Sequence, residues 1–214
     1  MNEPHYIPYV NSYDLLEKAY QSSKHYKYTT VIDNRERNKN EPSPRNLPNV
    51  GRIMEMPTHQ STAQIMNIMT HDTISMNLKY FTWQHCDAHF NPRVFDKFKE
   101  FVDTRKGTDW GIIYTYYDTL AAYNVEAINA VGGWDSLRFP WYFLDNDIAY
   151  RLHKAGFKMV QAPDNGHIFH EHSSTIRRDS ERNAINEVTF AASRILLNLK
   201  HPRGTEVPTE SRYE

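Results

Sequence analysis

The chain has 214 residues, a length that suits one α/β domain or one domain with a short appendage. Apolar residues make up 39% of the chain and charged residues 24%, which is ordinary for a globular protein. The net charge of −1 argues against a broad nucleic-acid-binding face, and no apolar run approaches the roughly 18 residues of a membrane span.

The single cysteine rules out an intrachain disulfide framework and fits a reducing compartment. The N-terminal sequence MNEPHYIPYV lacks the charged start and the apolar middle of a signal peptide. We therefore expect a cytoplasmic protein with no membrane span, which could also work peripherally at a membrane.

The first half of the chain predicts a strand, a helix and a second strand within about thirty residues, an order typical of a parallel sheet. Ser12 is the predicted N-cap of the first helix, and the second strand ends in Asp33 and Asn34. The charged, proline-rich segment that follows predicts a long loop. The elements expected in this half are strands at 5–10, 27–34, 52–56 and 79–85 and helices at 11–23, 61–74 and 91–103.

The second half is mixed. It predicts one or two strands at 110–124, a short helix from 125 that ends at Gly132-Gly133, a helix at 144–157, strands at 158–163 and 167–172, and a long helix at 181–201. Val188, Ala191, Ala192, Ile195 and Leu199 fall on one side of the long helix. This apolar stripe favours packing on the core, although the helix could also pair with a second subunit as a homodimer or touch a membrane.

The stretch QHCDAHF follows a predicted strand and carries Asp87 and His89 two residues apart. In an extended backbone these side chains point the same way, so both could bind one ion. His167, His170 and His172 offer a remote ligand, and a carboxylate with imidazoles suits Mn²⁺, Zn²⁺ or another first-row divalent ion. The alternative is a surface turn with ordinary polar residues.

Asp145 and Asp147 lie in the first turn of a predicted helix, where the helix dipole stabilises anions. They could cap the helix, or Asp145 could be a general base beside aromatic neighbours that exclude water. Similarly, the Trp134 of GGWD could stack on a sugar ring or be a buried core residue, and Asp33 could contact a nucleoside.

In this order the segments resemble one family, the large inverting family 2 of the GT-A fold glycosyltransferases, from about residue 6 to residue 175. The most specific part is GGWDSLRFPWYFLDNDIAYRLHKAGF, followed by HEHSST. HCDAHF resembles the family's DXD-type segment, and VIDNRE its second strand. The resemblance implies an α/β fold of the GT-A type, with a mixed, mainly parallel sheet flanked by helices.

The same resemblance implies how the chain is divided and which residues act. Residues 1–90 would be the nucleotide-sugar-binding half, 91–200 the acceptor-binding half of the same domain with a C-terminal helix, and 201–214 a mobile tail. The implied donor-site residues are Pro8, Tyr9, Asp33, Ser61 and Asp87. The implied metal ligands are Asp87, His89 and His170, with His172 as a second choice. Asp145 would be the catalytic base, and Trp134 and Asp135 would bind the acceptor.

The implied activity is a metal-assisted, inverting transfer of a hexosyl or deoxyhexosyl group from a nucleotide-diphosphate sugar to a hydroxyl of a glycan or another acceptor. Because His89 stands where a second acid is usual, Mn²⁺ is favoured over Mg²⁺. The near-neutral charge disfavours nucleic acid as the acceptor. Two other hypotheses are a metal-dependent hydrolase that uses the histidines and an inactive module that only binds sugar nucleotides.

Overall fold

The structure, a computed structural model, describes residues 3–36, 40–105, 109–115, 118–163, 168–171, 180–206 and 209–211. The strands are β1 (His5–Tyr9), β2 (Thr29–Asp33), β3 (Arg52–Glu55), β4 (Tyr80–Gln84), β5 (Ala88–Phe90), β6 (Trp110–Tyr114), β7 (Leu120–Asn124), β8 (Lys158–Gln161), β9 (Ile168–His170) and β10 (Thr209–Ser211). The helices are α1 (Tyr13–Ser23), α2 (Thr62–Ser75), α3 (Pro92–Thr104), α4 (Val125–Ala130), α5 (Leu144–Lys154) and α7 (Ser180–Lys200), with a 3₁₀ turn at Pro44–Asn46.

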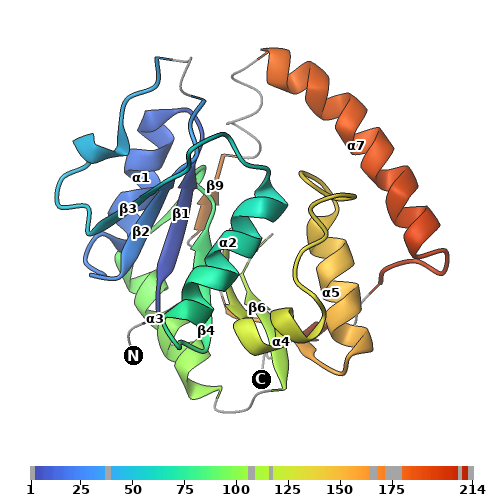
Figure 1. Cartoon of the computed structure of the whole chain (residues 1–214). Coiled ribbons are helices and arrows are strands. Elements are labelled where there is room, and N and C mark those ends of the chain that lie inside the picture. The colour runs from blue at the N-terminus through green and yellow to red at the C-terminus, as the bar shows by residue number, and fades with distance from the viewer. Residues whose placement is uncertain are drawn as a thin grey trace.

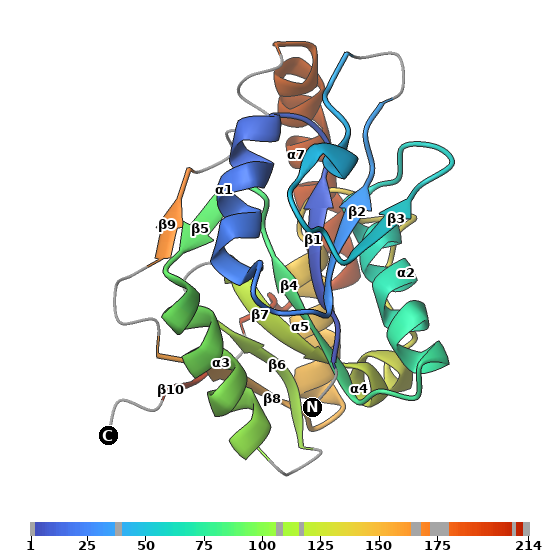
Figure 2. The same ribbon diagram turned by 90° about the vertical axis from the view of Figure 1, so that its left-hand side faces the viewer.

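Eight strands form one sheet in the order β10-β8-β6-β7-β4-β1-β2-β3 (Figures 1 and 2). β7 runs antiparallel to both of its neighbours, and the other pairs are parallel. The mixed, mainly parallel sheet predicted from the sequence is therefore confirmed. The carboxyl ends of β1, β2 and β4 meet at one edge of the sheet, which is where ligands bind in such folds.

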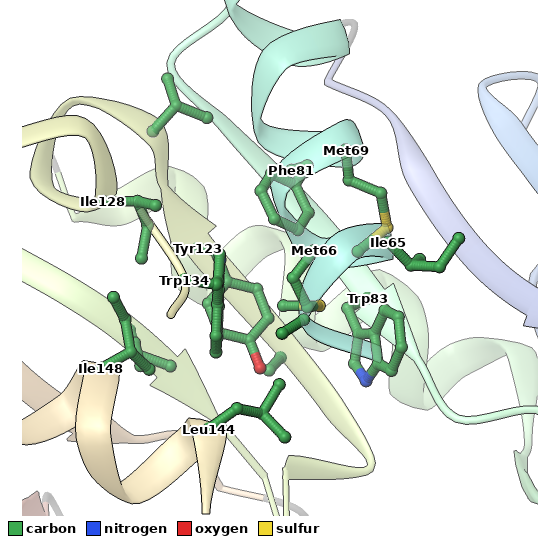
Figure 3. Close-up of a cluster of buried hydrophobic side chains, with 14 of the residues drawn as sticks. Ile65, Met66, Met69, Phe81, Trp83, Tyr123, Ile128, Trp134, Leu144 and Ile148 are labelled. Atoms are coloured by element: carbon green, nitrogen blue, oxygen red, sulfur yellow. The ribbon is translucent and has the colours of Figure 1, made fainter. Parts of the chain in front are cut away.

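Helices cover both faces of this sheet, with α1 and α3 on one side and α2, α4 and α5 on the other (Figures 1 and 2). Successive strand residues therefore enter different cores, as the two-residue period of a strand requires. Ile7 packs with α1 whereas Tyr6 packs on the opposite face, and Ile113 and Ile112 divide in the same way. Figure 3 shows the larger core, in which α2, α4 and α5 meet β4 and β7.

Two helix starts show why the chain folds locally in this way. The hydroxyl of Ser61 accepts a hydrogen bond from the Gln64 N–H, and the Gln64 side chain accepts one from the Ser61 N–H, which is a complete capping box for α2. Asn91 caps α3 ahead of Pro92. The N-cap predicted at Ser12 is wrong in one respect: Ser12 has φ 63° and its side chain makes no capping hydrogen bond.

Two strands, β5 and β10, were not predicted from the sequence. Segment 110–124 forms two strands, β6 and β7, and the short β5 after the QHC segment pairs antiparallel with β9. Within 201–214, for which a mobile tail is expected, β10 pairs in parallel with β8 at the edge of the sheet. None of the described helices combines the length and the apolar character that a membrane crossing needs.

The long helix α7 does not pack as predicted. It lies along one edge of the molecule (Figure 1) and meets the body through Ser193 and Leu197, which are buried. The predicted stripe faces outward, with Val188 71% and Leu199 74% exposed. The periodicity could not decide this orientation, because α7 carries apolar residues on two opposite sides.

Candidate functional site

A cavity of about 330 Å³ opens at the carboxyl ends of β1 and β4. Its walls come from segments far apart in the sequence: the end of β1, the turn after β4, the β6–β7 loop, the start of α5, and β9. The polar residues that line it include Asn34, His85, Asp87, Asp118, Asp145 and His170. Pro8, Asp87, Asp145 and His170, four of the predicted site residues, are thus brought to one place.

Two histidines and one aspartate gather on one wall of this cavity. His85 Nδ1 lies 3.8 Å and His170 Nε2 lies 3.3 Å from Oδ1 of Asp87. A turn after β4, in which the Ala88 N–H donates to the His85 carbonyl, holds His85 and Asp87 together. The pairing of β5 with β9 sets His170 beside them, because Ala88 is the register partner of His170.

This cluster has the geometry and the donor set of a divalent-cation site. One ligand atom from each of His85, Asp87 and His170 lies within 4.8 Å of the others. Burial would raise the pKa of Asp87, but the hydrogen bond from His170 and the nearby histidines lower it overall, so the carboxylate stays ionised. Burial lowers the pKa of His85 and keeps its imidazole neutral, the form that binds metals. Two imidazoles and one carboxylate fit Mn²⁺ or Zn²⁺ better than Mg²⁺.

His89, predicted to be a ligand of the same ion, is not in this cluster. The prediction assumed an extended backbone from Asp87 to His89, whereas Asp87 lies in the turn that precedes β5. The His89 ring stacks instead on Phe169 of β9, with ring centroids 5.2 Å apart. His167 and His172, the other proposed remote ligands, lie outside the described residues.

Two carboxyl groups, those of Asp145 and Asp118, line the same cavity as the cluster. Asp145 is the second residue of α5, and Asp118 lies in the β6–β7 loop with φ 51°. Asp145 is accessible to water from the cavity, but the surrounding protein and the negative charge of Asp118 raise its pKa to about 7. Burial likewise raises the pKa of Asp118 to about 7, and Asp118 lies 3.8 Å from Nε2 of His85.

A second cavity, of about 490 Å³, lies on the far side of these carboxyl groups. Asp118, Tyr123 and Asp145 line both cavities, so the two spaces share this wall. The rest of the second cavity is formed by Ile112, Tyr114, Asn146, Ala149, Met159, Thr205 and Glu206. The carboxyl group of Asp145 can therefore contact one molecule in the first cavity and another in the second.

The end of β2 provides the other polar edge of the first cavity. Asn34 lines it directly, whereas Asp33 is buried behind and receives two hydrogen bonds of 2.7 Å from Arg35. The Tyr9 hydroxyl donates to Glu41 and to the Pro42 carbonyl. Tyr9 and Asp33 thus contact residues of the loop that follows β2, beside this edge of the cavity.

Ser61 caps α2, as described above, and it is buried. Trp134 is also buried: its backbone N–H donates to the side chain of Asn67, and its ring packs against Tyr123. Asp135 receives hydrogen bonds from Lys200 and Arg138 and lines a separate depression near the end of α7. The structure therefore places these three predicted residues outside the two cavities.

Sequence reasoning named His85 only among the zinc ligands of the alternative metal-dependent hydrolase, and it missed Asp118. The signal for His85 was the turn propensity of the HCD stretch, which ends the strand early and turns Asp87 back toward His85. Asp118 carries no sequence signal, because its place depends on β6 and β7 forming a hairpin. The stacked pair of His59 and Trp141, with ring centroids 5.6 Å apart, was also missed, and Trp141 lines the first cavity.

A scan of the sequence against models of protein families finds no match, and a sequence search of curated proteins finds none. Solved structures do match. A cytidylyltransferase from Leptospira borgpetersenii serovar Hardjo-bovis has a TM-score of 0.52 and 12% identity over 99% of this chain and 100% of that chain. The catalytic domain of Drosophila beta1,4-galactosyltransferase 7, in complex with xylobiose, has a TM-score of 0.54 and 10% identity over 86% of this chain and 79% of that chain.

A third similar structure is S. aureus TarS 1-349 in complex with UDP-GlcNAc, with a TM-score of 0.57 and 10% identity over 78% of this chain. This chain spans 58% of that TarS chain and 37% of the chain in another TarS structure. At such identities the likeness concerns the fold. The chain has a GT-A-like fold, as the sequence resemblance implied.

Proposed function

We propose that the protein is a glycosyltransferase that moves a sugar from a nucleotide-diphosphate donor to an acceptor hydroxyl with inversion. The observation that carries this proposal is that Asp145 lines both cavities, the first of which is also lined by the cluster of His85, Asp87 and His170. A transferase needs a donor site and an acceptor site that meet at a base, and this arrangement supplies all three.

The donor would occupy the first cavity. Pro8, Asn34 and Asp87 line this space, and Trp141 and Tyr142 add aromatic surface on which a flat or apolar face of the donor can pack. The predicted donor-site residues Tyr9, Asp33 and Ser61 lie behind this lining and stay predictions of contact. Their support is the position of Asp33 and Tyr9 at adjacent strand ends, where nucleotides bind in parallel α/β sheets.

His85, Asp87 and His170 would hold a divalent ion, for which we favour Mn²⁺ over Mg²⁺ because of the two imidazoles. When bound, such an ion offsets the negative charge that develops on a leaving diphosphate. The chain itself fixes the orientation of these ligands, since β9 and the turn after β4 are joined by the hydrogen bond from the Glu171 N–H to the Asp87 carbonyl.

Asp145 would remove the proton from the acceptor hydroxyl as it attacks the anomeric carbon. A carboxylate with a pKa of about 7 is a stronger base than an ordinary aspartate and is still largely ionised above neutral pH. The acceptor would approach from the second cavity while the diphosphate would be held at the cluster in the first, which would put the attacking and leaving groups on opposite faces of the sugar. This placement supports a single displacement with inversion.

The acceptor would enter the second cavity. Three acidic groups, Asp118, Asp145 and Glu206, line it, and none of its described lining residues is basic. Ile112, Ala149 and Met159 add an apolar wall. We therefore propose a neutral or cationic hydroxyl compound, such as a glycan, rather than an anionic acceptor. The acceptor roles of Trp134 and Asp135 and the cytoplasmic location stay predictions.

Transfer and hydrolysis measured with a panel of nucleotide sugars, with and without Mn²⁺, test this function. We expect Mn²⁺-dependent release of nucleoside diphosphate from one donor, and we expect Asp145→Asn to abolish transfer while sparing donor binding. Unchanged turnover in Asp145→Asn would overturn the assignment of the base. Release of pyrophosphate from CTP and a sugar phosphate would instead indicate a nucleotidyltransferase, the class to which one of the similar structures belongs.

A further inference from the structure

The outer side of α7 is an uncharged apolar surface with no partner among the described residues. Ile185, Val188, Ile195 and Leu199 are 58%, 71%, 61% and 74% exposed. Ala184, Ala191 and Ala192 are exposed on the same side. These seven residues, here called the outer face of α7, run along about 22 Å of helix at the usual rise per residue. A contiguous exposed apolar surface of this kind marks an interaction site.

The inner side of α7 already packs against the body of the protein. Ser193 and Leu197 are buried, and the Phe190 ring packs 5.0 Å from the ring of Phe143. At the end of the helix, Lys200 lies 2.7 Å from carboxylate oxygens of both Asp135 and Asp147. The helix therefore cannot rotate to bury its outer face without breaking these contacts.

The outer face is self-complementary. Val188 and Ile195 alternate with Ala184 and Ala191 at the four- and three-residue spacing of a helix pair. If a second copy of the helix runs antiparallel and is set one residue from full overlap, Val188 lies level with Ala191 of the partner subunit and Ile195 level with Ala184 of the partner subunit. Large side chains then meet small ones, which allows the helices to approach closely.

The charges beside the outer face also match in this antiparallel arrangement. Glu187 and Arg194 lie on the same flank of the helix, seven residues apart. The twofold axis keeps this flank against itself, so Glu187 of each copy comes within one turn of Arg194 of the partner subunit. A helix that lies on a membrane has instead a predominantly basic border, whereas this flank carries one acid and one base.

We propose that the protein forms a homodimer through antiparallel pairing of the outer faces of α7. A symmetric pair buries the same patch on both subunits, as twofold interfaces do. The dimer would also support the first cavity, because the inner residue Phe190 packs on Tyr142 and Phe143, which line it. The proposal does not depend on the reaction that takes place in that cavity.

Sedimentation analysis of the full chain from about 1 to 100 µM tests the proposal, a range suited to an interface of modest size. We expect a concentration-dependent shift from 25.2 kDa to twice that mass. Val188→Asp should leave only monomer, because it sets a charge in the centre of the pair. Leu137→Asp is the matched control, since Leu137 is 92% exposed and does not belong to the outer face of α7.

Exchanging the charges of Glu187 and Arg194 tests whether the dimer forms through this antiparallel pairing. Glu187→Arg and Arg194→Glu should each weaken the dimer at least several-fold, and the double variant should restore it. Circular dichroism and retained thermal transitions show that the variants are folded. A wild-type monomer at all concentrations would overturn the proposal, as would a dimer that survives Val188→Asp. Binding of the monomer to neutral lipid vesicles that Val188→Asp abolishes would also overturn it, in favour of a membrane.

Discussion

Asp145 and Asp147 lie two residues apart on α5, but we expect their substitution by asparagine to have opposite consequences. Asp147 is fully buried and accepts hydrogen bonds from Arg151, Lys200 and His201 at 2.7–2.8 Å. Lys200 is the last residue of α7 and His201 follows it, so this carboxylate joins α7 to α5. Burial would raise the pKa of Asp147, but these three partners lower it overall.

Asp147→Asn leaves cationic groups around a neutral amide. Breaking a buried ion pair costs about 3–5 kcal/mol, and the low end applies because Arg151 and Lys200 are 20% and 24% exposed. For a chain of this size, a loss of about 3 kcal/mol lowers Tm by about 6–12 °C. Asp96→Asn is the control, since its exposed pair with His25 is worth less than about 1 kcal/mol.

The loss of stability caused by Asp147→Asn should depend on pH in a definite direction. A carboxyl group whose pKa is lowered by folding stabilises the protein above its unfolded pKa, near 4, and this stabilisation disappears as the pH falls through the folded value. The difference in Tm between wild type and Asp147→Asn should therefore be full at pH 7 and shrink below about pH 4. Differential scanning calorimetry at several pH values measures it.

Asp145→Asn should behave in the reverse way. Because the pKa of Asp145 is raised, its ionised form is disfavoured in the folded protein, and a neutral asparagine should leave Tm unchanged or higher at pH 8. Turnover should be lost. Two results would refute this reasoning: a drop in Tm of less than about 2 °C for Asp147→Asn, or loss of turnover in a folded Asp147→Asn that equals the loss in Asp145→Asn.

Two further predictions concern the cavity. His85→Ala should weaken Mn²⁺ binding at least tenfold in a calorimetric titration, because His85 belongs to the cluster. His89→Ala should change Mn²⁺ binding little. Equal effects of the two substitutions would contradict the assignment of His85 as a metal ligand. The value of kcat/KM should increase with pH, with a midpoint near pH 7, because Asp145 acts when it is ionised. Asp118→Asn should move this midpoint to lower pH, because it removes a charge that raises the pKa of Asp145. A limb that stays in place or moves up in Asp118→Asn would show that the two carboxyl groups are not coupled.

Much of the fold could be predicted because its signals are local. The strand–helix–strand start, the helix of α3 with Asn91 and Pro92 at its first turn, and the end of α5 before Gly156 all follow from caps, spacing and turn residues. The edge that binds ligands then follows from the parallel order of β1 and β2. These features need no knowledge of distant contacts.

The candidate site was predictable only in part, because it depends on pairing between distant segments. Asp145 and Asp87 could be found from their places at a helix start and a strand end. The choice of His85 over His89 depends on one turn, and the place of His170 depends on β9 joining β5 across the sequence. The predicted orientation of α7 was wrong for a similar reason. The helix has two apolar sides, and only the tertiary contacts of Leu197 determine which side is buried.

A structure with a nucleoside diphosphate sugar and Mn²⁺, with the metal located by anomalous scattering, tests the central claim most directly. We predict that the metal is bound by His85, Asp87 and His170, that the nucleotide lies in the first cavity, and that the anomeric carbon faces Asp145. A metal bound by His89, or a donor whose anomeric carbon faces away from Asp145, would contradict the account.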